Sequence, residues 1–121
     1  MFVNDKTKVT LLDSGYGEHI YELIGHVAGG SQQYSLAHIE LQPQCKSLKH
    51  YHPACDESFY ILSGNPLMLV NGESQRLRAG QVVVIPKPHW HQLYNDHDSD
   101  IVTFLAICLP AWTTDCSVFE Q

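Results

Sequence analysis

Short apolar segments separated by turn residues dominate the chain. Residues 34–42 alternate apolar and polar positions, which is typical of a strand with one buried face. Residues 13–24 contain two glycines and no apolar stripe of helical period, so a loop followed by a strand is expected there. Further apolar, β-branched or aromatic runs end at turn residues and occupy 57–62, 66–70, 82–86 and 101–109. Strands at this short spacing predict an all-β fold, an antiparallel sandwich or barrel.

The dipeptide Asn71-Gly72 marks the sharpest turn. A type I′ turn needs positive φ at both central residues, and Asn and Gly adopt positive φ at low cost. Residues 67–70 and 74–77 are therefore expected to form a hairpin around it.

The composition fits one folded domain over residues 1–121. Hydrophobic residues make up 44% of the 121 positions and charged residues 17%, with no repeat or linker. No apolar run approaches the roughly 20 residues of a membrane-spanning helix, and no signal-like N-terminus is evident, so a soluble cytoplasmic protein is expected. Seven basic against thirteen acidic residues give a net charge of −6. That balance argues against a nucleic-acid partner bound through phosphates.

Histidine is the most informative residue type. Eight histidines are present, and four of them form two His-x-His pairs, His50/His52 and His89/His91. The four cysteines form no C-x-x-C pair, and free thiols are expected.

His50 and His52 point to the same side of an extended strand because side chains alternate along it. Glu57 opens the next predicted strand, and His91 begins another after the hairpin has reversed the chain. Three imidazoles and one carboxylate suit a divalent transition metal ion and leave coordination positions free. The alternative is that these are hydrogen-bonded core residues of a site that has lost its metal.

These residues resemble the two motifs of the cupin superfamily. The first motif is matched by His50-x-His52-x4-Glu57-x6-Gly64, with Gln44 in place of its opening glycine. The second is matched by Gly80-x5-Pro86-x-Pro88-x2-His91-x3-Asn95, with Pro88 in place of its internal glycine. Both departures lie at turn positions and leave the four ligand positions intact. The resemblance covers residues 44–95.

The resemblance implies a jelly-roll β-barrel that holds one divalent ion (Fe, Mn, Ni, Zn, Co or Cu) through His50, His52, Glu57 and His91. It also implies an enzyme of dioxygenase (oxidoreductase), lyase or isomerase type, acting on a small polar metabolite that chelates the ion. A non-catalytic binding module is the alternative, and a purely structural ion is a third. Pairing of an N-terminal edge strand across a two-fold axis would give a homodimer.

The general base stays open at this point. His38 and His89 are the catalytic candidates, although either can equally be a surface or core histidine. On an extended strand, Phe59 and Ile61 point to the same side as Glu57, and Leu93 points to the same side as His91. These three side chains are therefore expected to form apolar walls around the ion.

Overall fold

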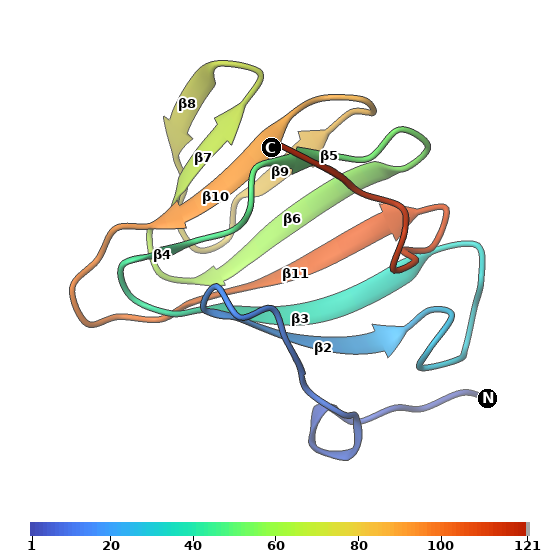
Figure 1. The fold of residues 1–121 in the computed structure, drawn as a ribbon. Coiled ribbons are helices and arrows are strands. Elements are labelled where there is room, and N and C mark those ends of the chain that lie inside the picture. Colours follow the sequence, from blue (N-terminus) through green and yellow to red (C-terminus); the bar gives the residue numbers. More distant parts are fainter. Residues whose placement is uncertain (121) are drawn as a thin grey trace.

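The computed structural model describes residues 1–120, and nearly all of its regular structure is β-strand (Figure 1). The elements are η1 (Lys6–Lys8), β1 (Leu12–Asp13), β2 (Glu18–Ile24), β3 (Ser35–Leu41), β4 (Cys45–Lys46), β5 (His50–Tyr51), β6 (Asp56–Ser63), β7 (Leu67–Val70), β8 (Glu73–Arg76), β9 (Val82–Ile85), β10 (His91–Asn95), β11 (Val102–Leu109) and β12 (Val118–Phe119). None of the helical structure in this range is long and apolar enough to cross a membrane.

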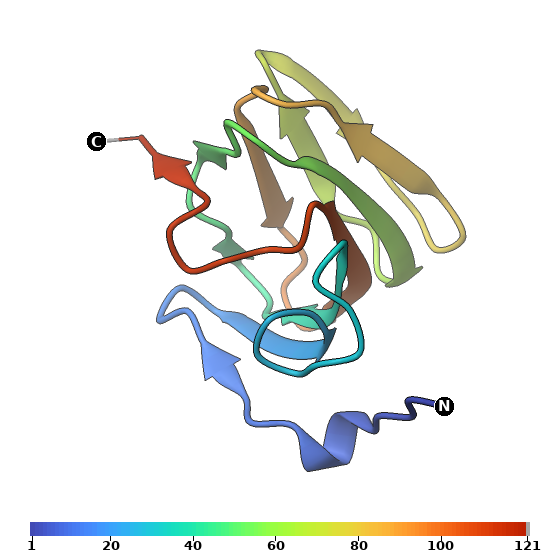
Figure 2. The same ribbon diagram turned by 90° about the vertical axis from the view of Figure 1, so that its right-hand side faces the viewer.

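The strands form two antiparallel sheets that face each other, as the two ribbon views show (Figures 1 and 2). The first sheet has the order β1-β2-β3-β11-β6-β9. The second has the order β12-β5-β10-β7-β8, and β4 also pairs with β10. Strand β11 lies centrally in the first sheet, where Leu105 is opposite His38 of β3 and Tyr60 of β6. This arrangement confirms the expected all-β, antiparallel jelly-roll fold.

The hairpin predicted at Asn71-Gly72 is present. Asn71 has φ 48° and Gly72 has φ 84°, the positive values that a type I′ turn requires. The two-residue turn places Val70 directly opposite Glu73, so β8 covers 73–76 rather than 74–77. Leu77 lies just beyond the strand and is 4% exposed, because its side chain packs into the core.

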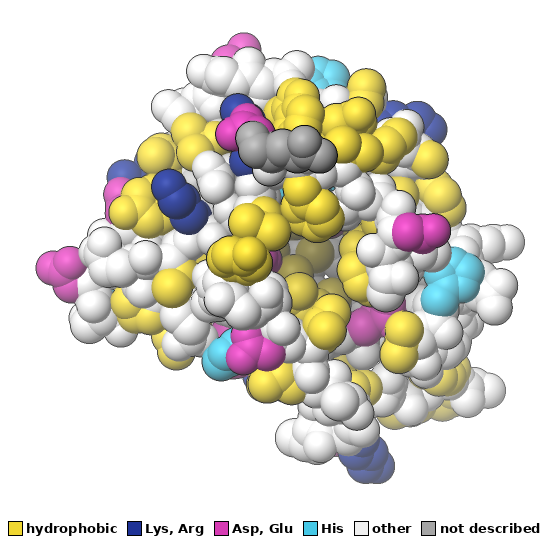
Figure 3. All heavy atoms as spheres, in the orientation of Figure 1, with side chains coloured by type: hydrophobic (Ala, Val, Ile, Leu, Met, Phe, Trp, Pro, Cys, Tyr) yellow, Lys and Arg dark blue, Asp and Glu magenta, His cyan; other side chains and the backbone are white. Residues whose placement is uncertain are grey.

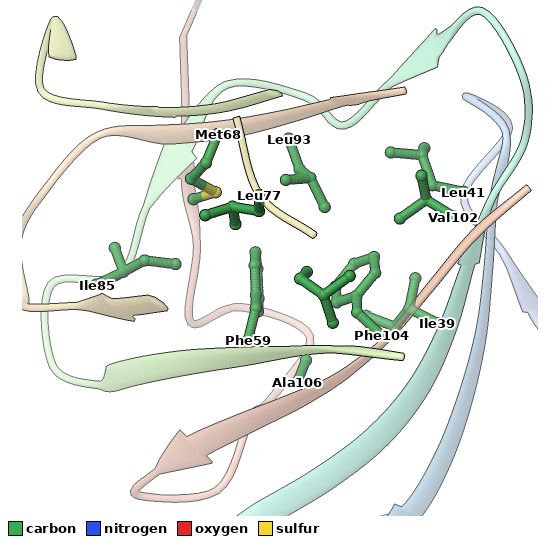
Figure 4. Packing of buried hydrophobic residues seen from close by; sticks show 11 residues of the cluster. Ile39, Leu41, Phe59, Met68, Leu77, Ile85, Leu93, Val102, Phe104 and Ala106 are labelled. Carbon is green, nitrogen blue, oxygen red and sulfur yellow. The ribbon is translucent and has the colours of Figure 1, made fainter. Parts of the chain in front are cut away.

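The space between the sheets is filled by apolar side chains from both layers. Figure 4 shows Phe59 and Phe104 side by side near the centre, and their ring centroids are 4.8 Å apart. The cluster comprises Ile39, Leu41, Phe59, Ile61, Met68, Leu77, Ile85, Leu93, Val102, Phe104 and Ala106. Burial of apolar surface is the main driving force that holds the two sheets together.

Two positions of the motifs need an unusual backbone. Gly64 has φ +88°, and a Cβ there would come within 2.7 Å of Val102 Cγ2. Gln44 stands where the first motif has glycine and adopts φ 58°, a conformation that costs a non-glycine residue free energy. Its side-chain amide donates hydrogen bonds of 3.0 Å to Asp96 O and to Asp98 Oδ1, which offset that cost.

Asn95 provides a test of this architecture. Its buried side-chain amide donates to Leu41 O at 3.0 Å and to Asp100 O at 2.8 Å, and its oxygen accepts from His97 N at 3.2 Å. Asn95→Ala leaves these groups without partners, and a loss of about 2 to 3 kcal/mol in the free energy of unfolding is expected in urea titrations.

The matched control is Asn65→Ala, because Asn65 is exposed and its side chain donates only a long 3.5 Å hydrogen bond to Leu77 O. It is expected to cost less than about 1 kcal/mol. Equal losses in the two variants would contradict the role given to Asn95.

Candidate metal site

Four predicted ligands converge at one place between the sheets. His50 of β5 lies directly opposite His91, the first residue of β10, in the second sheet. His52 follows β5, and Glu57 lies in β6 of the first sheet. One donor atom from each of the four side chains lies within 4.8 Å of the other three. The structure therefore brings both sheets together at a single His₃Glu cluster.

Glu57 is at the centre of this cluster. Its Oε1 atom lies 3.2 Å from His52 Nε2 and 3.0 Å from His91 Nε2. The ring centroid of His50 lies 4.2 Å from that of His91 and 5.0 Å from that of His52. His52, Glu57 and His91 are all buried, and His50 is half-buried.

Backbone carbonyls orient two of the imidazole rings. His50 Nδ1 donates to Leu48 O at 2.7 Å, and His91 Nδ1 donates to His89 O at 3.2 Å. When Nδ1 carries the proton, Nε2 presents a lone pair, as in metal-binding histidines whose second nitrogen is held by a carbonyl. The chain thus directs the Nε2 atoms of both rings as ligand atoms.

His91 Nε2 provides the test of whether a cation fits. This nitrogen is fully buried and makes no hydrogen bond, although Glu57 Oε1 lies only 3.0 Å away. A lone pair and a carboxylate oxygen at that distance repel each other, and a buried unpaired polar atom is costly. A cation bound to both atoms would remove both penalties, so the residues fit a divalent metal ion.

The surroundings set the charge of the cluster. Burial raises the pKa of Glu57, but the hydrogen bond and charge of His52 act in the opposite direction, and that pKa stays below its usual value. Burial and the neighbouring His91 lower the pKa of His50 to about 4, so His50 is neutral near pH 7. Burial by itself would lower the pKa of His52, but hydrogen bonds to Cys116 and Glu57 raise it to about 10.

A cavity of about 630 Å³ extends from the cluster between the sheets. Figure 3 shows a hollow in this face of the molecule, ringed mainly by hydrophobic side chains. Phe59 and Leu93 line the cavity as expected, whereas Ile61 does not line it and is fully buried in the core. Other apolar lining residues include Leu12, Ile20, Ala37, Ile39, Phe104, Ala106, Trp112 and Phe119.

Glu18 also lines this cavity and was not found from the sequence. Burial, and then the charge of Glu57, raise the pKa of Glu18 to about 7, while His91 acts in the opposite direction. The available signal was parity: Glu18 shares the side of β2 that carries Ile20, which also lines the cavity. The two glycines before Glu18 interrupt regular alternation, so the parity of this residue is a weak signal in the sequence.

The structure does not bring His38 or His89 to the cluster. Ala37 and Ile39 line the cavity, so alternation along β3 turns His38 to the outer face, where its ring meets Tyr21 edge-on. His89 is half-buried in the turn before β10, and its Nδ1 bonds to Pro86 O at 2.8 Å. Neither histidine lines the cavity, so neither is in place to exchange protons with a ligand there.

Known proteins share both sequence and fold with this chain. TcmJ, a tetracenomycin polyketide synthase protein of Streptomyces glaucescens, is 33% identical over 66 residues, which cover 54% of this chain and 44% of that protein. The chain spans less than half the length of the curated relatives it matches.

Two solved structures illustrate the similarity of fold. A Streptomyces PAC13 variant with uridine has a TM-score of 0.82 at 8% identity, covering 100% of this chain and 92% of that chain. A Thermotoga maritima protein described as a predicted oxalate decarboxylase has a TM-score of 0.77 at 22% identity, covering 90% of this chain and 99% of that chain. At these identities the likeness concerns the fold alone.

The sequence also matches the family described as Cupin domain over residues 37–108. That range contains the four clustered residues and seven of the strands that form the two sheets. The chain belongs to the cupin family.

Proposed function

We propose that this protein is a mononuclear metal-dependent enzyme whose ion is held by His50, His52, Glu57 and His91. The observation that carries the proposal is the buried, unpaired His91 Nε2 facing Glu57 Oε1 at 3.0 Å. The donor set of three imidazoles and one carboxylate suits Fe, Mn, Ni, Zn, Co or Cu. When bound, such an ion acts as a Lewis acid that polarises an oxygen atom of the substrate.

The cavity walls indicate the kind of substrate. Most of the lining is apolar, while the polar side chains include the cluster itself and Glu18. A ligand that fills this space needs an apolar ring or chain to contact the walls and oxygen atoms to reach the cluster. This description refines the small polar metabolite expected from the sequence. A polyketide-type compound with neighbouring carbonyl oxygens fits it, and the relative TcmJ carries polyketide synthase in its name.

Glu18 is proposed as the acid–base group of the reaction. It lines the same cavity as Glu57 and His50, and burial raises its pKa to about 7. A carboxyl group with a pKa near the working pH can both accept and donate a proton. Proton transfer of this kind favours a lyase or isomerase reaction over the dioxygenase alternative.

A non-catalytic binding module is the second candidate function. It is favoured by the placement of the two histidines expected as acid–base groups, because His38 faces outward and His89 lies outside the cavity lining, so neither supplies a proton-transfer group there. The two candidates differ in whether Glu18 takes part in turnover, and the variants below separate them.

His91→Ala removes one proposed ligand and should abolish metal binding at the His₃Glu cluster. Elemental analysis of protein purified without a metal-affinity step is expected to give about one ion fewer per chain in the variant than in the wild type. His52→Ala is likewise expected to lose the ion of this cluster. His38→Ala is the matched control, because His38 lies on the outer face of β3, and it should retain the wild-type ion content. An unchanged ion content in His91→Ala would exclude the assigned ligands.

Glu18→Gln tests the environment of Glu18 through the pH dependence of stability. Because burial raises the folded-state pKa from 4.5 to about 7, the folded state binds more protons than the unfolded state in that range. The wild type therefore loses stability as pH rises from about 4.5 to about 7, and Glu18→Gln lacks this loss. Urea unfolding with a chelator present, at several pH values, measures the difference.

The control for this measurement is Glu73→Gln, which changes an exposed carboxylate in β8. Its stability is expected to follow the wild-type pH profile. A Glu18→Gln profile parallel to that of the wild type would show that Glu18 is not buried as described.

Catalysis can be measured with benzoylacetone, a simple compound with an aromatic ring and two neighbouring carbonyl oxygens. Product formation and deuterium exchange at the carbon between the carbonyls, followed by NMR, report proton transfer. Glu18→Gln should slow these steps by roughly 10²- to 10⁴-fold while the ion is retained. Unchanged rates in Glu18→Gln would remove Glu18 from the mechanism, and saturable binding without any conversion would favour the binding module.

A further inference from the structure

A second group of donor atoms lies on the other side of the His52 ring. His52 Nδ1, Cys55 Sγ and Cys116 Sγ all lie within 4.8 Å of one another, and the distance from Cys116 Sγ to His52 Nδ1 is 3.5 Å. Cys55 is buried in the loop before β6, and Cys116 is half-buried in the segment between β11 and β12. Figure 1 shows that segment returning from the end of β11 towards β5, so the loop between β5 and β6 and the C-terminal segment meet here.

The contacts around His52 Nδ1 differ from those of the other two rings. His50 Nδ1 makes one short hydrogen bond, of 2.7 Å, to a backbone carbonyl. His52 Nδ1 instead has three longer contacts, at 3.3 Å to Cys116 O, 3.3 Å to Ser117 Oγ and 3.5 Å to Cys116 Sγ. A nitrogen surrounded by acceptors and a thiol, none of them at the usual 2.9 to 3.0 Å, has room for an ion.

The chemistry of the three donors is that of a soft metal site. Two cysteine sulfurs and one imidazole nitrogen are ligands that Zn²⁺ binds in proteins, commonly in tetrahedral geometry. Both sulfurs are free thiols. Cys45 lies in β4, outside this group, and Cys108 Sγ donates to Glu57 Oε2 at 3.1 Å. Cys55 and Cys116 therefore differ from the other two cysteines, because their sulfur atoms form a group with His52 Nδ1.

We propose that His52 Nδ1, Cys55 Sγ and Cys116 Sγ form a second metal site, for a thiophilic divalent ion of the zinc class. Binding releases the two thiol protons and the Nδ1 proton of His52 to solvent, and the Nδ1 lone pair freed in this way binds the ion. The hydroxyl of Ser117, which lies 3.3 Å from the same nitrogen, or a water molecule completes the coordination. The site goes beyond the proposed function, because neither its ligands nor its occupancy depends on turnover.

Two consequences follow for the protein. His52 belongs to both clusters, through Nε2 to the His₃Glu cluster and through Nδ1 to the thiol pair. Simultaneous occupation of the two sites therefore requires the ring to lose both of its protons and to bridge the ions as an imidazolate. The segment that carries Cys116 also supplies Trp112, Thr114 and Ser117 to the lining of the cavity. An ion bound to Cys116 would fix this segment to the barrel and so hold one wall of the cavity in place.

The test uses Cd²⁺ added to the full chain under anaerobic, reducing conditions. Thiolate ligation produces a sulfur-to-cadmium charge-transfer band in the ultraviolet. The wild type should develop this band with one thiolate-bound ion per chain. Cys55→Ser and Cys116→Ser should each lose the band and bind more weakly, by at least roughly 10- to 100-fold, since even outer-shell partners of a metal ligand are worth that much.

Two controls separate this site from the His₃Glu cluster. Cys45→Ser removes a thiol outside the group and should leave the band unchanged. His91→Ala breaks the proposed catalytic site but not the thiol group, so the band should persist in that variant. The two proposals are therefore independent, because the measurements can disprove either metal site while the other is retained.

Cysteine alkylation provides a measurement that needs no variant. Bound Cd²⁺ should protect Cys55 and Cys116 from iodoacetamide without protecting Cys45, as read by mass spectrometry. Absence of the band in the wild type, its survival in both serine variants, its loss in His91→Ala, or equal alkylation with and without Cd²⁺ would each overturn the proposal.

Discussion

The burial of the Glu57 carboxylate between two sheets is the constraint on which the site depends. An ionised carboxylate inside a protein is strongly disfavoured unless opposite charge and hydrogen bonds compensate for the lost hydration. His52 supplies part of that compensation at 3.2 Å from Glu57 Oε1, and the Cys108 thiol donates to Oε2 at 3.1 Å. The compensation is incomplete without a cation, because His91 Nε2 stays unpaired. The same arrangement that costs the fold free energy would favour a bound cation.

The fold tolerates the free-energy cost of the buried carboxylate because the remainder of the interior is apolar and well packed. The buried cluster around Phe59 and Phe104 lies beside the site and contains only hydrophobic side chains. The lining of the cavity is mainly apolar and includes Glu18 together with His50, His52 and Glu57 of the cluster. Electrostatic interactions are stronger in such surroundings than in water, and they shift pKa values in the directions seen for His50 and Glu18.

His52 connects two parts of the protein that are far apart in the sequence. One ring nitrogen faces Glu57, and the other faces the segment that carries Cys116. A metal ligand oriented by a second contact keeps its ring fixed and its basicity tuned. Here that second contact is a thiol-bearing segment that also lines the cavity, so the shape of the cavity and the chemistry of the cluster are linked through a single imidazole.

The sequence by itself determined the longer strands, the Asn71-Gly72 hairpin and the four residues of the cluster, but not the two-residue strands β1, β4 and β12. Each of these depends on local rules, namely alternation along a strand, positive φ in a two-residue turn, and motif spacing. Only the tertiary structure decided the remainder. Glu18 is separated from Glu57 by two intervening strands in the sheet order, and Cys116 is 64 residues from His52. Pairings between distant segments depend on how the sheets close. Local patterns do not encode that closure, so they predicted which residues could bind a metal but not which other groups would surround it.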